Sequence, residues 1–246
     1  RAIEEEQFLV YLQPKYRLSD GSPCGAEALV RWFHEQKGFI SPGQFIPALE
    51  KGGYISELDR YMIEKVTGCL DQRRAEKKRF VPVSVNLSWM DFYDENMLEW
   101  IVRGLKKNNP NEQKIRFEIT ETSLAAIGEN HTRMLMHLKE NGAEILLDDF
   151  GSGYSSFGML QDYDFDILKM DISFVRNIGV NKKSESILRA IIDMAHQLGI
   201  RLVAEGAETE EQVAFLRANG CDYIQGYYYY KPMPENEFLQ LLDEGK

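Results

Sequence analysis

Short apolar segments with strand composition alternate with amphipathic helical segments along the chain, and this repeat restricts the fold more than any other feature. Apolar residues recur at helical spacing in Ile55–Leu70 and again in Ile187–Leu198. A strand followed by a helix, repeated, predicts a parallel sheet covered by helices. The predicted strands are Phe8–Leu12, Gly25–Trp32, Val81–Leu87, Ile115–Ile119, Ala143–Asp148, Asp166–Met170, Arg201–Ala204 and Asp222–Gln225.

The length of the chain favours a closed barrel over an open sheet. It has 246 residues, and single β/α barrels have about 250. The turn Ser19–Ser22, which joins the first two strands, is too short for a helical crossover and indicates a hairpin. We therefore predict an α/β fold, a modified TIM-like (β/α)8 barrel with one antiparallel strand near the N-terminus. Residues 1–246 are expected to form a single domain, excised from a longer multidomain signalling protein because residue 1 is arginine.

Composition excludes several classes of function. The net charge of −10 argues against binding to polymeric nucleic acid or to an anionic membrane, which would need a basic face. No apolar stretch reaches the roughly 18 residues of a membrane span. Three widely spaced cysteines fit a reducing compartment. We expect a cytoplasmic domain without membrane contact of its own, although the full-length protein could be membrane-anchored.

Polar and charged residues lie at the ends of the predicted strands, where β/α barrels carry their active sites. Asp148 and Asp149 are adjacent, and two carboxylates 4 Å apart repel by about 4 kcal/mol at an effective dielectric constant near 20. This pair predicts a bound cation. Carboxylate and amide oxygens suit Mg²⁺ or Mn²⁺, whereas the four histidines, which zinc prefers, fall in predicted helices or loops. The strand-end residues are Glu27, Asn86, Glu118, Glu121, Asp148, Asp149, Lys169, Asp171, Glu205 and Gln225.

Short motifs extend over essentially the whole chain. They are Glu27–Trp32, Ser84–Ser88, Phe117–Glu121, Asp148–Ser156, Leu168–Val175, Ala204–Gly206 and Gln225–Tyr227, together with Gln13-Pro14 and Lys231–Pro234. In this order and at this spacing, the chain resembles the EAL-domain cyclic di-GMP phosphodiesterases. The resemblance implies hydrolysis of the bacterial second messenger cyclic di-GMP to linear pGpG by a water molecule that two metal ions activate.

The resemblance also implies a role for each matching residue. Glu27, Asn86, Glu118 and Asp148 would hold one Mg²⁺ or Mn²⁺ ion, and Asp148 would bridge to a second ion that Asp149 also binds. Lys169 and Glu205 would activate the attacking water, with Asp171 nearby, and Gln225 would help to position water and metal ligands. Gln13, Arg31 and Glu27 would contact the substrate. Glu121, Gly151 and Gly153 would control the loop after the fifth strand.

Further expectations from the resemblance concern partners. The domain is expected to form a homodimer and to work with regulatory domains of the full-length protein. Two alternatives remain open. One is a receptor that binds cyclic di-GMP without hydrolysing it. The other is a metal-dependent barrel enzyme with a different substrate, such as a lyase.

Overall fold

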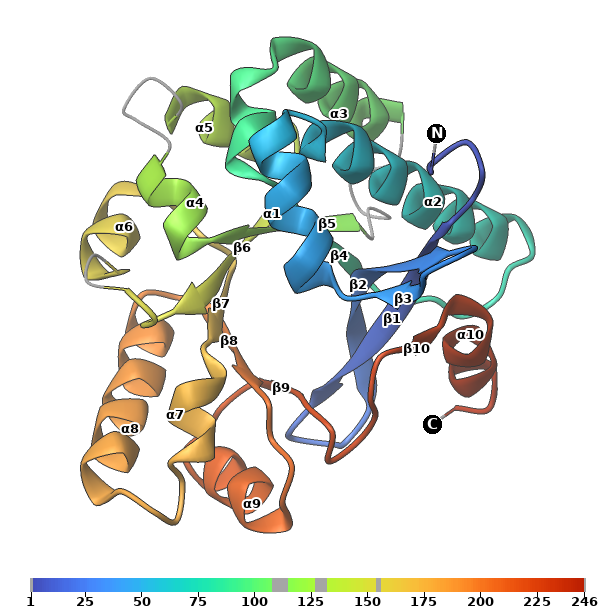
Figure 1. Ribbon diagram of the computed structural model, residues 1–246. Helices are drawn as coiled ribbons and strands as arrows, with labels where there is room; N and C mark the ends of the chain where they lie inside the picture. The colour runs from blue at the N-terminus through green and yellow to red at the C-terminus, as the bar shows by residue number, and fades with distance from the viewer. Residues whose placement is uncertain (1, 108–114, 127–131, 154–155, 246) are drawn as a thin grey trace.

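The computed structural model describes residues 2–107, 115–126, 132–153 and 156–245, and their strands form a barrel. The sheet order is β10-β1-β9-β8-β7-β6-β5-β4-β2-β3, and an additional pairing between β1 and β2 closes the ring. Figure 1 shows the helices around the outside of this ring. The strands are β1 (Phe8–Arg17), β2 (Pro23–His34), β3 (Gly38–Ile40), β4 (Val83–Asn86), β5 (Ile115–Thr120), β6 (Glu144–Phe150), β7 (Ile167–Met170), β8 (Arg201–Glu205), β9 (Tyr223–Gln225) and β10 (Met233–Pro234).

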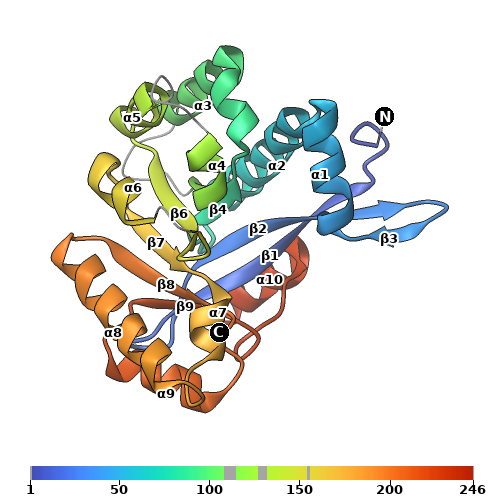
Figure 2. The same ribbon diagram turned by 60° about the vertical axis from the view of Figure 1, so that its left-hand side comes forward.

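The direction of β1 confirms the predicted modified barrel. β1 runs antiparallel to both of its neighbours in the ring, β2 and β9. The pairs from β2 through β4 to β9 are parallel. β1 and β2 form a long hairpin, and Figure 2 shows them side by side with α10 next to them. The barrel prediction is therefore correct, including its single reversed strand.

β1 continues five residues beyond the predicted end at Leu12, through Arg17. The predicted strand stops two residues before Pro14, which cannot donate a ladder hydrogen bond. In the structure, β10 pairs with β1 at Tyr11 and Leu12, and β9 pairs at Tyr16 and Arg17. Pro14 lies between these two pairings, where β1 has β2 as its partner on one side only. A missing N–H group is tolerated at such a place.

The helices cover the outer face of the barrel. They are α1 (Pro42–Gly52), α2 (Ile55–Ala75), η1 (Trp89–Tyr93), α3 (Glu95–Lys107), α4 (Glu121–Ala126), α5 (Thr132–Glu140), α6 (Ser156–Asp162), α7 (Ile172–Arg176), α8 (Lys182–Gln197), α9 (Glu210–Ala218) and α10 (Glu235–Asp243). Among the described residues, no helix combines the length and the apolar composition that a membrane crossing requires.

The predicted apolar face is right for α2 and partly wrong for α8. Ile55, Leu58, Met62, Val66 and Leu70 are all buried on α2. On α8, Ile191 is buried, but Ile187 and Leu198 are exposed. The face that α8 buries is formed by Leu188, Ile191, Ile192 and Ala195. The spacing identified the helix correctly, but Ile187 lies outside the buried stripe and Leu198 follows the last residue of the helix.

A pair of buried carboxyl groups links α2 to η1. Asp59 of α2 and Asp91 of η1 both accept a hydrogen bond from the Ser88 amide, at 3.2 and 2.9 Å. Burial raises the pKa of both carboxyl groups, and the nearby charge of Asp91 adds to the effect at Asp59, whose pKa lies well above its usual range. Two buried carboxyl groups in contact cannot both ionise cheaply, so this pair retains a proton at pH values where exposed aspartates are ionised.

We predict that Asp59→Asn stabilises the protein at pH 8 and flattens its stability profile. A carboxyl group whose folded pKa lies above its unfolded pKa stabilises the fold at low pH, and this contribution is lost as the pH rises towards the folded pKa. An amide can donate to Asp91 without sharing a proton. We expect about 1 kcal/mol, or about 3 °C in Tm, at pH 8 and less at pH 5. Thermal unfolding at both pH values tests this.

The matched control is Asp71→Asn, which neutralises an exposed aspartate on the same helix. It should leave the pH dependence of Tm as in the wild type. An identical pH dependence in the wild type and in Asp59→Asn would show that the carboxyl pair does not share a proton.

Candidate active site

A buried lysine lies at the centre of the acidic residues inside the barrel. Lys169 projects from β7 and is 1% exposed. Among the described residues, its ammonium group forms ion pairs with four carboxylates, each from a different strand. The Nζ–oxygen distances are 2.5 Å to Glu118, 2.7 Å to Glu205, 3.0 Å to Asp148 and 3.3 Å to Glu27. A charge this deeply buried requires such partners, so Lys169 and the acids fix each other's positions.

Lys15 supplies a second buried cation that sequence reasoning did not assign to the site. Its ammonium group donates to Glu118 Oε1 at 2.5 Å and to Ser84 Oγ at 2.7 Å. Strand alternation could have revealed it, because Lys15 lies two residues after Gln13 and therefore on the same face of β1. Burial alone would raise the pKa of Glu118, but Lys15 and Lys169 together lower it to about 2.

Asp148 and Asp149 contribute to the same site although they are neighbours in sequence. Successive residues of a regular strand point to opposite faces. The regular pattern breaks here because Asp149 adopts a left-handed backbone with φ of 56°, and the β6–β7 register shifts between Leu147 and Phe150. Carboxylate oxygens of Asp148, Asp149 and Glu205 consequently lie within 4.8 Å of one another.

The donor set fits hard divalent cations. Oxygens of Glu27, Glu118 and Asp148 form one group within 4.8 Å, and Asp148 belongs also to the group with Asp149 and Glu205. Asn86, at the end of β4, donates through Nδ2 to Glu27 Oε1 at 3.2 Å, so its side-chain amide group lies beside the first group. Such oxygen ligands suit Mg²⁺ or Mn²⁺. His34, expected outside the strands, is the last residue of β2 instead.

Two glutamines extend the network. Gln225 donates through Nε2 to Glu27 Oε2 at 2.6 Å and to Gln13 Oε1 at 3.1 Å. Within the described part of the chain, Gln225 Oε1 is buried without a hydrogen-bond partner. A water molecule or a cation bound beside the acids would satisfy this unpaired acceptor.

An open pocket of about 310 Å³ leads to these residues. Gln13, Glu27, Asp148, Lys169, Glu205 and Gln225 line it, and Arg176 and Glu208 lie at the same pocket. Arg31 is not part of this lining. Its guanidinium group lies 5.4 Å from the centre of the Tyr11 ring and donates to the Val30 carbonyl. Asp171 accepts a hydrogen bond from the Ser173 amide and thereby caps α7.

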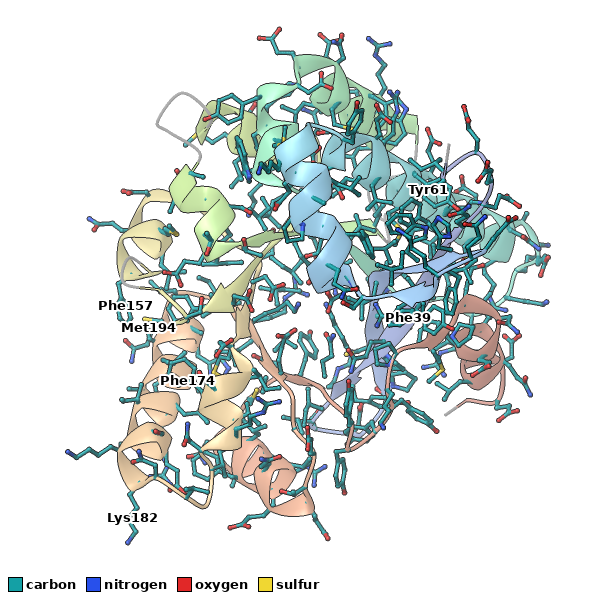
Figure 3. All side chains as sticks on the ribbon, in the orientation of Figure 1. Phe39, Tyr61, Phe157, Phe174, Lys182 and Met194 are labelled. Carbon is teal, nitrogen blue, oxygen red and sulfur yellow. The ribbon has the colours of Figure 1, made fainter. Side chains whose placement is uncertain are left out.

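Glu121 contacts the loop that follows β6. The Gly151 amide donates to Glu121 Oε2 at 3.2 Å. A Cβ atom at Gly153 would lie 2.6 Å from Glu121 Oε1, and one at Gly151 would lie 2.5 Å from the ring of Phe174, which Figure 3 labels on α7. Gly151 also has a φ of 90°, so this position requires glycine, whereas a side chain at position 153 would require the carboxylate of Glu121 to move. Tyr154 and Ser155 of the Asp148–Ser156 motif lie outside the described residues.

Comparison with known proteins identifies the family. The model of the EAL domain family matches residues 1–232. The chain belongs to the EAL domain family. It is 33% identical to the cyclic di-GMP phosphodiesterase NbdA of Pseudomonas aeruginosa, over 95% of this chain and 30% of that protein. It is 31% identical to the probable cyclic di-GMP phosphodiesterase PdeG of Escherichia coli, over 98% of this chain and 48% of that protein.

A solved EAL-domain structure agrees in fold. The PaMucR phosphodiesterase, in a c-di-GMP complex, superimposes with a TM-score of 0.85 at 32% identity, covering 96% of each chain. This EAL domain spans less than half the length of either curated relative. The family assignment applies to the barrel described here.

We predict that metal binding by this EAL domain releases protons and strengthens with pH. Burial raises the pKa of Asp148, Asp149 and Glu205, and the charges of Glu118 and Glu205 raise that of Asp148 further, whereas Lys169 lowers it. A cation must displace any proton held on these groups, so one displaced proton changes the affinity by up to about tenfold per pH unit. Affinity should therefore fall between pH 8 and pH 6.

Isothermal titration of Mn²⁺ at pH 7, in two buffers with different ionisation enthalpies, counts the released protons. A titration into buffer alone corrects for heats of dilution. Binding without proton release, at an affinity that does not change with pH, would contradict the prediction.

Proposed function

We propose that this domain hydrolyses cyclic di-GMP to linear pGpG with Mg²⁺ or Mn²⁺ in a two-metal site. The observation that carries the proposal is the pair of oxygen clusters that share Asp148 beneath an open pocket. Membership of the EAL family, the phosphodiesterase names of NbdA and PdeG, and the c-di-GMP complex of PaMucR support the substrate.

Glu27, Asn86, Glu118, Asp148 and Asp149 would hold the cations. When bound, two such ions stabilise the attacking and leaving oxygens of an in-line displacement at phosphorus. The protein contributes fixed geometry, because these ligands project from β2, β4, β5 and β6 of one closed barrel. Positions fixed before the substrate arrives remove much of the entropic cost of the reaction.

Glu205 is the proposed proton acceptor for the attacking water. It lines the pocket, and burial raises its pKa towards the range in which a carboxylate accepts a proton effectively. Lys169, 2.7 Å from Glu205, orients that carboxylate and carries positive charge for the phosphodiester. Gln225 would position the water, and Asp171 would act from nearby, at the start of α7.

Substrate binding is proposed to use Gln13 and Glu27 in the pocket and Arg31 at its approach. Burial lowers the pKa of the Arg31 guanidinium group, whereas interactions with Tyr227 and Glu27 raise it. Both Tyr227 and Glu27 line the pocket. Arg176 adds a positive charge to the lining. These two cations place positive charge near the pocket and attract an anionic dinucleotide there, although the chain as a whole carries a net charge of −10.

Removal of metal or of a shared ligand should abolish product formation. We expect Asp148→Asn and Glu27→Ala to retain no more than about 1% of wild-type turnover, because each takes a ligand from the cluster. Excess chelator should have the same effect on the wild type, and added Mn²⁺ should reverse it. Chromatographic measurement of pGpG checks both expectations.

Asp164→Asn is the control, since this exposed aspartate pairs with Lys139 outside the pocket. It should react at the wild-type rate. Wild-type turnover that is unaffected by chelator would overturn the metal requirement.

Glu205→Gln should reduce turnover more than binding. The amide cannot accept the proton of the attacking water, so we expect kcat to fall by about 10² or more while the Kd for cyclic di-GMP changes by less than about threefold. Single-turnover kinetics and equilibrium binding separate the two quantities. Near-wild-type turnover of this variant would remove Glu205 from the proposed role.

A cyclic di-GMP receptor without hydrolytic activity is the second candidate. It is favoured by one observation, namely that Lys169 and Lys15 already neutralise part of the acidic cluster, which reduces the need for bound metal ions there. Ligand binding with Mg²⁺ and with Mn²⁺, each without any pGpG, would establish the receptor.

The setting of the domain is also part of the proposal. We propose that it lies in the cytoplasm, forms a homodimer, and is controlled by regulatory domains through the loop with Glu121, Gly151 and Gly153. The fraction of NbdA and PdeG that it spans supports the additional domains.

A further inference from the structure

Lys15 differs from Lys169 in what surrounds it. It is 4% exposed and does not line the pocket, so it has no route to the substrate. Its ammonium group contacts Glu118 and Ser84, and the Ser84 hydroxyl in turn donates to the Ala26 carbonyl at 3.2 Å. The strand that carries Lys15 is paired with β2 on both sides of it, at Pro14 and Tyr16. Lys15 is thus fixed beneath the acidic cluster.

Each of the two lysines donates a hydrogen bond to a different oxygen of Glu118. Lys15 takes Oε1 and Lys169 takes Oε2, both at 2.5 Å. The partners of Lys169 are the acids of the cluster, so an entering cation competes with Lys169 for them. Lys15 contacts Glu118 alone among these acids, from below, and it keeps its bond to Ser84. A cation that replaces Lys169 at Glu118 therefore still meets a carboxylate with one oxygen already bound to Lys15.

This restraint matters differently to different divalent ions. Ca²⁺ accepts both oxygens of one carboxylate and six to eight ligands in total, whereas Mg²⁺ requires near-octahedral geometry with shorter bonds. A carboxylate that offers one oxygen from a fixed position suits the smaller ion. A carboxylate that is free to rotate and to offer both oxygens suits Ca²⁺ better.

We propose that Lys15 is a positioning residue that holds one oxygen of Glu118 and so makes the metal site discriminate against Ca²⁺ in favour of Mg²⁺ or Mn²⁺. This inference rests on the proposed function in one respect, since Glu118 must be a metal ligand. Lys15 contacts neither substrate nor attacking water and acts through Glu118.

The test is the ratio of two metal affinities in Lys15→Met. Isothermal titration gives the Kd for Mg²⁺ and for Ca²⁺ in the wild type and the variant, without substrate. Methionine nearly preserves the volume of the side chain. Loss of the lysine charge strengthens binding of both ions, but they carry equal charge, so that effect cancels in the ratio. We expect the ratio Kd(Mg²⁺)/Kd(Ca²⁺) to rise about tenfold in the variant.

Ser84→Ala is the matched control, because it removes the other partner of Lys15 and keeps the bond to Glu118. Its ratio should stay within about twofold of the wild type, even where the melting temperature falls. A purely structural role of Lys15 would lower stability in both variants without changing the ratio in either. An unchanged ratio in folded Lys15→Met overturns the inference.

Lys15→Gln covers the case in which the methionine variant does not fold. The glutamine amide nitrogen lies one bond nearer the backbone than the lysine nitrogen, so in the same side-chain conformation it falls short of Glu118 Oε1. The ratio should again rise, and an unchanged ratio counts against the inference. Failure of the wild type to bind either ion is a separate result, because it removes the proposed metal site itself.

Discussion

The ion pairs of Lys169 are the interaction on which the rest of the site depends. A single ammonium group at the centre of the barrel holds carboxylates from four other strands. Without a cation, these acids would repel one another inside a low-dielectric interior. The barrel explains how so many charges converge, since parallel strands bring their carboxyl ends to one rim. The lysine explains why the arrangement is stable before any metal ion arrives.

Much of the fold was predictable from the sequence because local patterns and tertiary structure agree. Every predicted strand is present, and the hairpin at Ser19–Ser22 correctly indicated the reversed strand. The continuation of β1 through Pro14 was not predictable, because it depends on the neighbouring strands. Pro14 is acceptable in β1 since it lies in the gap between the pairing with β10 and the pairing with β9. The exposed positions of Ile187 and Leu198 likewise depend on how α8 packs, which spacing alone does not determine.

The candidate site, like the fold, was predictable from the sequence only in part. The strand-end rule located Lys169 and the acids Glu27, Glu118, Asp148, Asp149 and Glu205, which the structure brings together in one cluster. Lys15 was not assigned to the site because it lies beyond the predicted end of the first strand at Leu12, although β1 continues through it. The buried Asp59–Asp91 pair was not found either, since the contact joins residues of separate helices that have no periodic relationship. Arg31 lies over Tyr11 outside the pocket lining, so its proposed contact with substrate concerns the approach to the site.

The left-handed backbone at Asp149 limits which residues that position accepts. Beyond glycine, asparagine and aspartate are the residues that adopt this conformation most readily. A single nucleotide change converts an aspartate codon into one for asparagine or glycine. Position 149 can therefore lose its negative charge in one mutational step while the end of β6 keeps its shape. The same geometry that gathers the acids offers a short evolutionary route from the proposed phosphodiesterase to the receptor that is the second candidate function.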